Sequence, residues 1–169
     1  MIIDHLPART YKMHNKGFTL IELMVIIAIV SIILAIAIPS LTGFATATRV
    51  SAQANEFIAS VSFARSEAVK RNGTVSLCPS SDGASCASST KNWSAGWIVS
   101  LADGTVLRVY TGSTGGATLT ASTAGALTFN PNGQLSSAIN FDLCGGTNSR
   151  SIRISQIGRV ESINPSSGC

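Results

Sequence analysis

The feature that most constrains this chain is an apolar block near its N-terminus, residues 18–38, in which Glu22 is the only charged residue among twenty-one. As an α-helix these residues would extend about 31 Å, close to the roughly 30 Å hydrocarbon core of a bilayer. A secretory signal peptide has a shorter apolar region that ends in a small-residue cleavage site, whereas this block ends in Ile38-Pro39-Ser40. We therefore predict a transmembrane helix over residues 18–38, with a signal peptide or a buried core helix as the alternatives.

The charges before the block predict its orientation. Arg9, Lys12 and Lys16 precede it and are opposed only by Asp4. Because positively charged flanks stay in the cytoplasm, the N-terminus is expected there and the rest of the chain outside.

The cysteines agree with an exported body. All four follow the apolar block: Cys78, Cys86, Cys144 and Cys169. An even number in an exported domain favours two disulfides, and of the three connectivities we expect Cys78 with Cys86 and Cys144 with Cys169. A zinc site is the competing interpretation, but the chain has no Cys-x-x-Cys, and its only histidines, His5 and His14, precede the block. We expect no metal and no cofactor.

A helical period continues beyond the block over residues 39–73. Apolar residues recur every three or four positions: Val50, Ala54, Phe57, Ile58, Val61, Ala64, Ala68 and Val69. Polar residues fill the other side: Gln53, Glu56, Ser60, Ser66 and Lys70. We therefore predict one helix over residues 18–72, amphipathic in its second half and stopped at Gly73. Pro39 lacks an N–H for the carbonyl of Ala35, which predicts a kink.

After Gly73 the period changes to two, which is typical of strands. The expected strands are residues 74–78, 96–102, 105–110, 127–130, 139–143, 151–155 and 159–163. Asp103-Gly104 and Asn132-Gly133 are favourable tight turns, while residues 80–90 and 111–125 are polar and expected to be loops. The pattern predicts an α+β chain in which an antiparallel sheet over residues 74–169 packs on the amphipathic helix.

One motif stands directly before the apolar run. Lys16-Gly17-Phe18-Thr19-Leu20-Ile21-Glu22 resembles the class III signal of type IV prepilins and type II secretion pseudopilins. The resemblance implies that a prepilin peptidase cleaves the leader, residues 1–17, after Gly17 and that the new terminal Phe18 is N-methylated. Removal of 17 residues from 169 leaves a mature chain of 152. The leader is long for this class, so a start at Met13 is an alternative.

Glu22 would be the fifth residue of the mature chain. A carboxylate inside the bilayer costs on the order of 3 kcal/mol, so it requires a partner. The cationic amine of Phe18 lies four residues away and can pair with Glu22 of the same or a neighbouring subunit. We therefore predict a role in assembly, the alternative being a carboxylate that stays hydrated at the interface.

Four later segments resemble the GspH/FimT family of minor pilins and minor pseudopilins: Phe63-Ala64-Arg65-Ser66-Glu67-Ala68-Val69, Trp93-Ser94-Ala95-Gly96-Trp97-Ile98-Val99, Phe129-Asn130-Pro131-Asn132-Gly133 and Gly158-Arg159-Val160. The resemblance implies a type IV pilin-like fold, a long N-terminal helix packed on an antiparallel β domain, in which Trp93, Trp97 and Phe129 are core aromatics. It also implies its partners: major and minor pilins or pseudopilins, the prepilin peptidase, an inner-membrane assembly platform and the lipid bilayer. Before assembly the chain would cross the bacterial inner membrane once; afterwards it would be in a periplasmic or extracellular pilus or pseudopilus.

An enzyme is disfavoured. Loss of the leader leaves no histidine for acid–base or nucleophilic catalysis, and Ser88-Ser89-Thr90-Lys91 has Ser-x-x-Lys spacing without its partner motifs. We expect a minor pilin that supports assembly of a type IV pilus, in its initiation or tip complex. The alternatives are a minor pseudopilin of a type II secretion system and a DNA-binding minor pilin of natural transformation.

The candidate DNA contacts are Arg150, Arg153 and Arg159. Beyond the apolar block, nine Lys and Arg minus six Asp and Glu give a net charge of +3. A DNA-binding branch of the family carries Gly-Arg-x-Arg near the C-terminus, whereas this chain has Gly158-Arg159-Val160-Glu161. Glu161 thus reverses one charge, and a solvated strand face is the alternative role for these arginines.

Overall fold

The computed structural model describes residues 17–113 and 116–163, with residues 37–42 described by their backbone alone. Leader residues 1–16 and Cys169 lie outside the described residues. The chain divides into two compact units, Met1–Ser40 and Leu41–Cys169. The helix α1, Leu20–Arg71, contributes to both. The predicted kink at Pro39 concerns the angle between the units and stays a prediction. Among the described residues, no helix combines the length and the hydropathy needed to cross a membrane.

The C-terminal end of α1 is closed by a Schellman motif. The N–H of Asn72 donates to the carbonyl of Val69 at 3.2 Å, and the N–H of Gly73 donates to that of Ala68 at 3.1 Å. The predicted stop at Gly73 is therefore close, but Asn72 adopts the left-handed conformation, with φ of 48°. Asn tolerates this conformation better than most residues.

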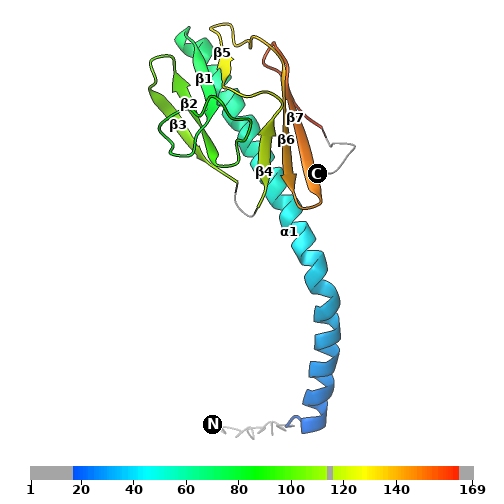
Figure 1. Ribbon diagram of the computed structural model, residues 1–169. Helices are drawn as coiled ribbons and strands as arrows, with labels where there is room; N and C mark the ends of the chain where they lie inside the picture. The colour runs from blue at the N-terminus through cyan, green and yellow to red at the C-terminus, as the bar shows by residue number, and fades with distance from the viewer. Residues whose placement is uncertain (1–16, 114–115, 164–169) are drawn as a thin grey trace, which may run out of the picture. The chain divides into compact units, whose positions relative to one another are not determined.

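The described part of the chain has eight strands, which form two antiparallel four-stranded sheets (Figure 1). The first has the order β3-β2-β1-β5 and the second β4-β6-β7-β8. Their bounds are β1 Val75–Pro79, β2 Gly96–Leu101, β3 Val106–Thr111, β4 Thr118–Ala121, β5 Leu127–Phe129, β6 Ile139–Gly145, β7 Asn148–Ile154 and β8 Val160–Ile163.

The seven predicted strands are confirmed within a few residues, but two expectations were wrong. Residues 111–125 were expected to be a loop, yet β4 lies within them and pairs with β6, burying Leu119 and Ala121. A single sheet was expected, whereas the strands divide between two. Strand character is local, but the choice of partner depends on packing between distant segments.

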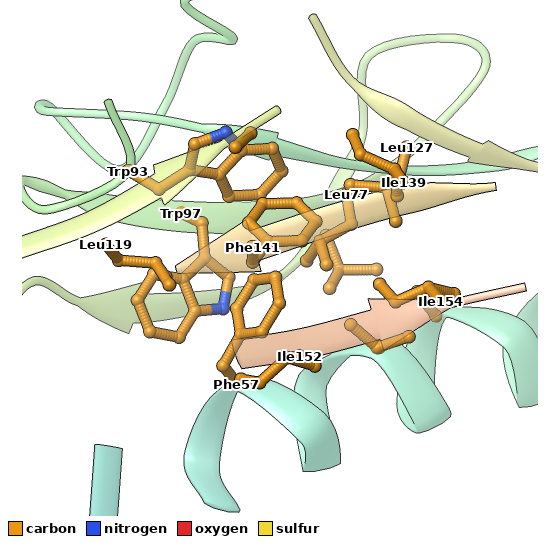
Figure 2. Close-up of a cluster of buried hydrophobic side chains, with 14 of the residues drawn as sticks. Phe57, Leu77, Trp93, Trp97, Leu119, Leu127, Ile139, Phe141, Ile152 and Ile154 are labelled. Atoms are coloured by element: carbon orange, nitrogen blue, oxygen red, sulfur yellow. The ribbon is translucent and has the colours of Figure 1, made fainter. Parts of the chain in front are cut away.

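Both sheets pack against one face of α1. Phe57 is fully buried there, and its ring lies 5.8 Å from Trp93, 5.4 Å from Trp97 and 4.6 Å from Phe141 between ring centroids. Figure 2 shows these four rings together between α1 and strands of both sheets. The expectation that Trp93, Trp97 and Phe129 belong to the core is confirmed, since all three are 0% exposed.

Two residues of α1 lie on the face of the helix opposite to the one predicted for them. Ser60 was placed on the polar side but is fully buried, and Val69 was placed on the apolar side but is 53% exposed. The indole N–H of Trp97 donates to the Ser60 hydroxyl, which in turn donates to the carbonyl of Phe57. A buried serine is stable here because both of its hydrogen-bonding functions are used.

The segment between β1 and β2 joins the sheets. The N–H of Trp93 donates to the carbonyl of Leu119 in β4 at 2.8 Å, and the Ser94 hydroxyl accepts from the N–H of Leu119 at 2.9 Å. A Cβ atom at Gly112 would lie 2.1 Å from the carbonyl oxygen of Ser94. The tryptophan-containing motif thus holds the two sheets in contact.

The predicted disulfide between Cys78 and Cys86 is confirmed, with Cα atoms 5.5 Å apart. Cys144 also takes part in a disulfide. Its predicted pairing with Cys169 stays a prediction because Cys169 lies outside the described residues.

Candidate functional site

The predicted processing bond lies at the start of the described chain. Gly17 and Phe18 precede α1 and have no regular secondary structure. Phe18 is 76% exposed, and no atom lies within 4 Å of a Cβ atom placed on Gly17. Among the described residues, none beyond its chain neighbours crowds Gly17.

Thr19 caps the helix that follows. Its hydroxyl accepts from the N–H of Glu22 at 3.3 Å, and its carbonyl accepts from the N–H of Leu23 at 3.2 Å. Thr-x-x-Glu is the spacing of a capping box, and a carboxylate in the first helical turn interacts favourably with the helix dipole. This spacing in the sequence predicts the cap, which the sequence analysis missed. The backbone N–H of Glu22 thus takes part in the helix cap, while the role of its carboxylate in assembly stays a prediction.

The helix begins at Leu20 rather than at Phe18 as expected. Phe18 precedes the cap, so in the uncleaved chain it is not on a helical face with Glu22. The pairing between the Phe18 amine and Glu22 stays a prediction for the mature chain.

The first half of α1 carries an apolar surface. Its large side chains are exposed within the described residues, among them Leu20 at 76%, Ile21 at 70%, Ile32 at 63% and Ile36 at 73%. An apolar surface of this extent is characteristic of a segment that contacts lipid or other proteins.

The three arginines proposed to contact DNA do not form one patch. Alternate residues of a strand lie on opposite faces, so Arg150 shares a face with the buried Ile152 and Ile154, and Arg153 lies on the other. Arg150 also lies 3.5 Å from the Ser51 hydroxyl of α1. The prediction of a three-arginine patch is therefore wrong in its geometry.

Glu161 partly compensates the positive charges of Arg153 and Arg159. Its carboxylate lies 3.3 Å from Nε of Arg159, and Glu161 is the cross-strand partner of Arg153. Both side chains of the Arg159–Glu161 pair are exposed, so the pair adds little stability. Its main effect is to place a negative charge between two arginines.

Arg65 is a residue whose role the sequence analysis missed. Its Nε donates to the carbonyl of Gly133 at 3.1 Å, and its Nη1 donates to that of Gly158 at 3.3 Å. One side chain of α1 thereby holds a turn after β5 in the first sheet and the β7–β8 turn in the second. Three of the segments that resemble the GspH/FimT family meet at this guanidinium. Their joint presence in that resemblance was the sequence signal that could have indicated a contact between them.

The two turns approach each other too closely for larger residues. Gly133 and Gly158 have φ angles of 71° and 75°, which favour glycine. A Cβ atom on Gly158 would lie 2.5 Å from the carbonyl oxygen of Gly133 and 2.8 Å from Nε of Arg65. Glycine at position 158 is thus required by conformation and by space.

A groove of about 380 Å³ lies beside this contact. Ile58, Ser62, Arg65 and Ser66 of α1 line one side, and Gly158, Arg159 and Val160 line the other. Ile58 and Val160 are partly buried against the core, so they provide the groove with apolar surface.

The loop closed by Cys78 and Cys86 is organised by Asp82. Its carboxylate accepts from the hydroxyl and the N–H of Ser85, the N–H of Ala84 and the hydroxyl of Ser80. These hydrogen bonds hold the pKa of Asp82 well below its usual range, and the bond from the Ser85 hydroxyl has the largest effect. Asp82 is thus a structural residue of the loop.

Within residues 17–113 and 116–163, no group of three or more His, Cys, Asp or Glu side chains is arranged to hold a metal ion. Ser88 and Lys91 lie in the exposed loop between β1 and β2. In this loop the Ser-x-x-Lys spacing has no helix to place the two side chains on one face.

Comparisons with protein families match both parts of the chain. Residues 53–158 match the family described as Type II transport protein GspH. Residues 12–38 match the prokaryotic N-terminal methylation motif.

Solved structures with the same fold come from two bacteria. The type IV minor pilin FimU of Pseudomonas aeruginosa, in space group P21, is 27% identical with a TM-score of 0.61, covering 75% of this chain and 96% of that chain. A second FimU crystal form, P65, gives 27% identity and a TM-score of 0.56, with 70% and 96% covered. The minor pseudopilin EpsH from the type II secretion system of Vibrio cholerae is 11% identical with a TM-score of 0.51, covering 70% and 99%. At that identity EpsH indicates the fold alone.

Proposed function

The chain belongs to the GspH family of type II transport proteins, and on this premise we propose that it is a minor pilin that supports assembly of a type IV pilus. Minor pilins and minor pseudopilins share its α+β fold, a long N-terminal helix followed by antiparallel sheets. The observation that carries the choice is the similarity to FimU, a type IV minor pilin, which extends over 75% of this chain at 27% identity. We place the subunit in the initiation or tip complex, as a low-abundance member of the filament.

The N-terminal segment would carry out anchoring and processing. The match of residues 12–38 to the N-terminal methylation motif supports cleavage after Gly17 and methylation of Phe18. Residues 18–38, with one charge in twenty-one positions, would anchor the chain in the inner membrane, with the N-terminus cytoplasmic. The body then faces the periplasm and, after assembly, belongs to the pilus.

The partners follow from this pathway. The prepilin peptidase acts on the Gly17–Phe18 bond, and the inner-membrane assembly platform receives the mature chain. In the filament, other major and minor pilins replace lipid around the exposed apolar side chains of α1. This exchange carries little hydrophobic cost because the apolar area stays out of water throughout.

Substitution of Glu22 tests whether this residue acts in filament assembly. Glu22→Val removes a polar group from the apolar block, so membrane insertion should be maintained or improved while incorporation into filaments falls. Thr19→Ala is the matched control because it removes the helix cap but keeps the carboxylate. Quantification of the chain in sheared filaments should show a loss for Glu22→Val and near-normal amounts for Thr19→Ala. Normal incorporation of Glu22→Val contradicts the pairing role.

A minor pseudopilin of a type II secretion system is the second candidate, favoured by the description of the matching family. The two machines differ in their output. Deletion of the gene should reduce surface pili if the chain is a minor pilin, and secretion of folded exoproteins if it is a pseudopilin. Scoring transformation in the same strain separates DNA capture from both.

A further inference from the structure

We propose that the groove between α1 and the β7–β8 turn docks a segment of a neighbouring filament subunit that presents a carboxylate beside an apolar side chain. The inference deepens the proposed function, on which it rests, by assigning the chemistry of one contact between subunits. The groove is lined by Ile58, Ser62, Arg65, Ser66, Arg159 and Val160.

The first argument is the charge of Arg65. Its hydrogen bonds go to two backbone carbonyls, which do not neutralise a guanidinium. Ion pairs within 4.0 Å are formed by Lys70, Arg71 and Arg159, among others, whereas none among the described residues involves Arg65. Since the partner carbonyls belong to two turns that are each closed by a backbone hydrogen bond, the guanidinium is held in place before a partner arrives. A carboxylate is the group that matches its planar set of donors.

The second argument is the shape and polarity of the walls. The Ser62 and Ser66 hydroxyls donate to the carbonyls of Ile58 and Ser62 in their own helix, at 2.9 and 2.8 Å. They therefore present small surfaces that let a partner chain approach. Ile58 and Val160 add partly buried apolar area.

These properties favour a protein segment over nucleic acid. The Arg159 charge is already paired with Glu161, so the groove offers one unpaired cation, Arg65, whereas binding of a phosphate backbone depends on several. Phosphate backbones gain little from apolar area such as Ile58 and Val160. An acidic side chain next to an apolar one satisfies Arg65 and covers the apolar wall together.

Ser62 provides a test that leaves the fold intact. It is exposed and bonds only within its own helix turn. Ser62→Glu places a negative charge in the groove, and Ser62→Lys is the matched control of similar size and helix propensity. Both variants would be made in the full-length chain, expressed in cells that assemble the filament, with a photo-crosslinking amino acid at position 66. In a control chain the photo-crosslinking amino acid replaces the exposed Lys91, which lies outside the groove, so that it reports contacts made elsewhere on the surface.

We expect the probe at position 66 to form an adduct with another subunit that carries an N-terminal methylation motif, identified by its peptides. Ser62→Glu should lower the yield at least about fivefold because like charges meet at the contact. Ser62→Lys should keep or raise it, and the Lys91 probe should respond to neither.

Three results overturn the proposal: an adduct that Ser62→Glu does not weaken, an equal loss with both substitutions, or an adduct with DNA. Incorporation of the unsubstituted chain into filaments is measured in the same cells. If it is normal while the adduct is insensitive to charge, only the docking groove is refuted. If the chain never enters filaments, the proposed function fails and the groove proposal fails with it.

Discussion

The indole N–H of Trp97 in β2 donates a 2.9 Å hydrogen bond to the hydroxyl of Ser60 in α1, and both residues are 0% exposed. The contact joins the first sheet to the helix at the centre of the aromatic cluster, where the Trp97 ring also stacks on Tyr110. A hydrogen bond inside an apolar core fixes the relative orientation of the groups it joins, because apolar packing alone is nondirectional.

Ser60→Ala should destabilise the body by about 1–3 kcal/mol because it leaves the buried indole N–H of Trp97 without its acceptor. Ser62→Ala is the matched control in the same helix, since the Ser62 hydroxyl is exposed, and it should change stability by less than about 0.5 kcal/mol. Urea unfolding of residues 41–169, followed by tryptophan fluorescence, measures both. Equal effects of the two substitutions would show that the Trp97 bond is not stabilising.

Gly158→Ala should destabilise the junction of the two turns more than Gly104→Ala. Both glycines have positive φ, 75° and 87°, so both substitutions strain the backbone. Only at Gly158 does the added methyl meet other atoms, the Gly133 carbonyl and the Arg65 side chain, whereas Gly104 has nothing within 4 Å. We expect an excess of about 1–3 kcal/mol for Gly158→Ala, as for overpacking of a close contact. Thermal unfolding of both variants checks it, and equal midpoints would contradict the observed approach.

Much of the fold was predictable because its signals are local. The three- and four-residue period of α1 and the alternation in seven strands depend on neighbouring residues only. The strand β4, Thr-Leu-Thr-Ala, was missed because four residues among serines, threonines and glycines carry little propensity of their own. Its strand conformation depends on pairing with β6, about twenty residues later, and on burial of Leu119.

The site was only partly predictable. Gly17, Phe18 and Glu22 form a contiguous motif, so one segment of sequence identifies them. Arg65 acts through carbonyls 68 and 93 residues away, and no local pattern indicates such contacts. The opposite faces of Arg150 and Arg153 follow from their odd spacing, but Arg150 lay outside the predicted strand. The rule that alternate residues of a strand lie on opposite faces could be applied to Arg150 only after the structure placed it within β7.

Removal of Cys169 should destabilise the terminal sheet by about 2–5 kcal/mol, the usual effect of losing a disulfide in a small exported domain. The prediction depends on a Cys144–Cys169 bond, which non-reducing peptide mapping should detect beside the Cys78–Cys86 bond. Unfolding of Cys169→Ser with and without reductant measures the effect, with Cys86→Ser as the comparison for the smaller loop. A free thiol at Cys169 in the unreduced protein would contradict the prediction.

DNA binding should be weak and limited by Glu161. With Arg150 on the opposite face, only Arg153 and Arg159 can reach phosphate together, so log affinity should fall against log salt with a slope of about −1.8. Glu161→Arg removes the ion pair with Arg159 and adds a third cation, which should tighten binding and steepen the slope to about −2.7.

A gel shift of the full chain in detergent, at physiological salt, should show little retention of DNA before that substitution. Arg159→Ala is the control for the residual binding. Micromolar or tighter binding by the unsubstituted chain, lost in Arg159→Ala, would make DNA capture the primary function.

The most direct test of the proposed function is the intact mass of the chain recovered from cells that express the matching prepilin peptidase. We predict one species that begins at Phe18, heavier by a single methyl group on its terminal amine, with both disulfides formed. In a strain without the peptidase the leader should remain attached. A species cleaved beyond Ile38 and released as a free body, or one that keeps its leader when the peptidase is present, would contradict its assignment as a pilin.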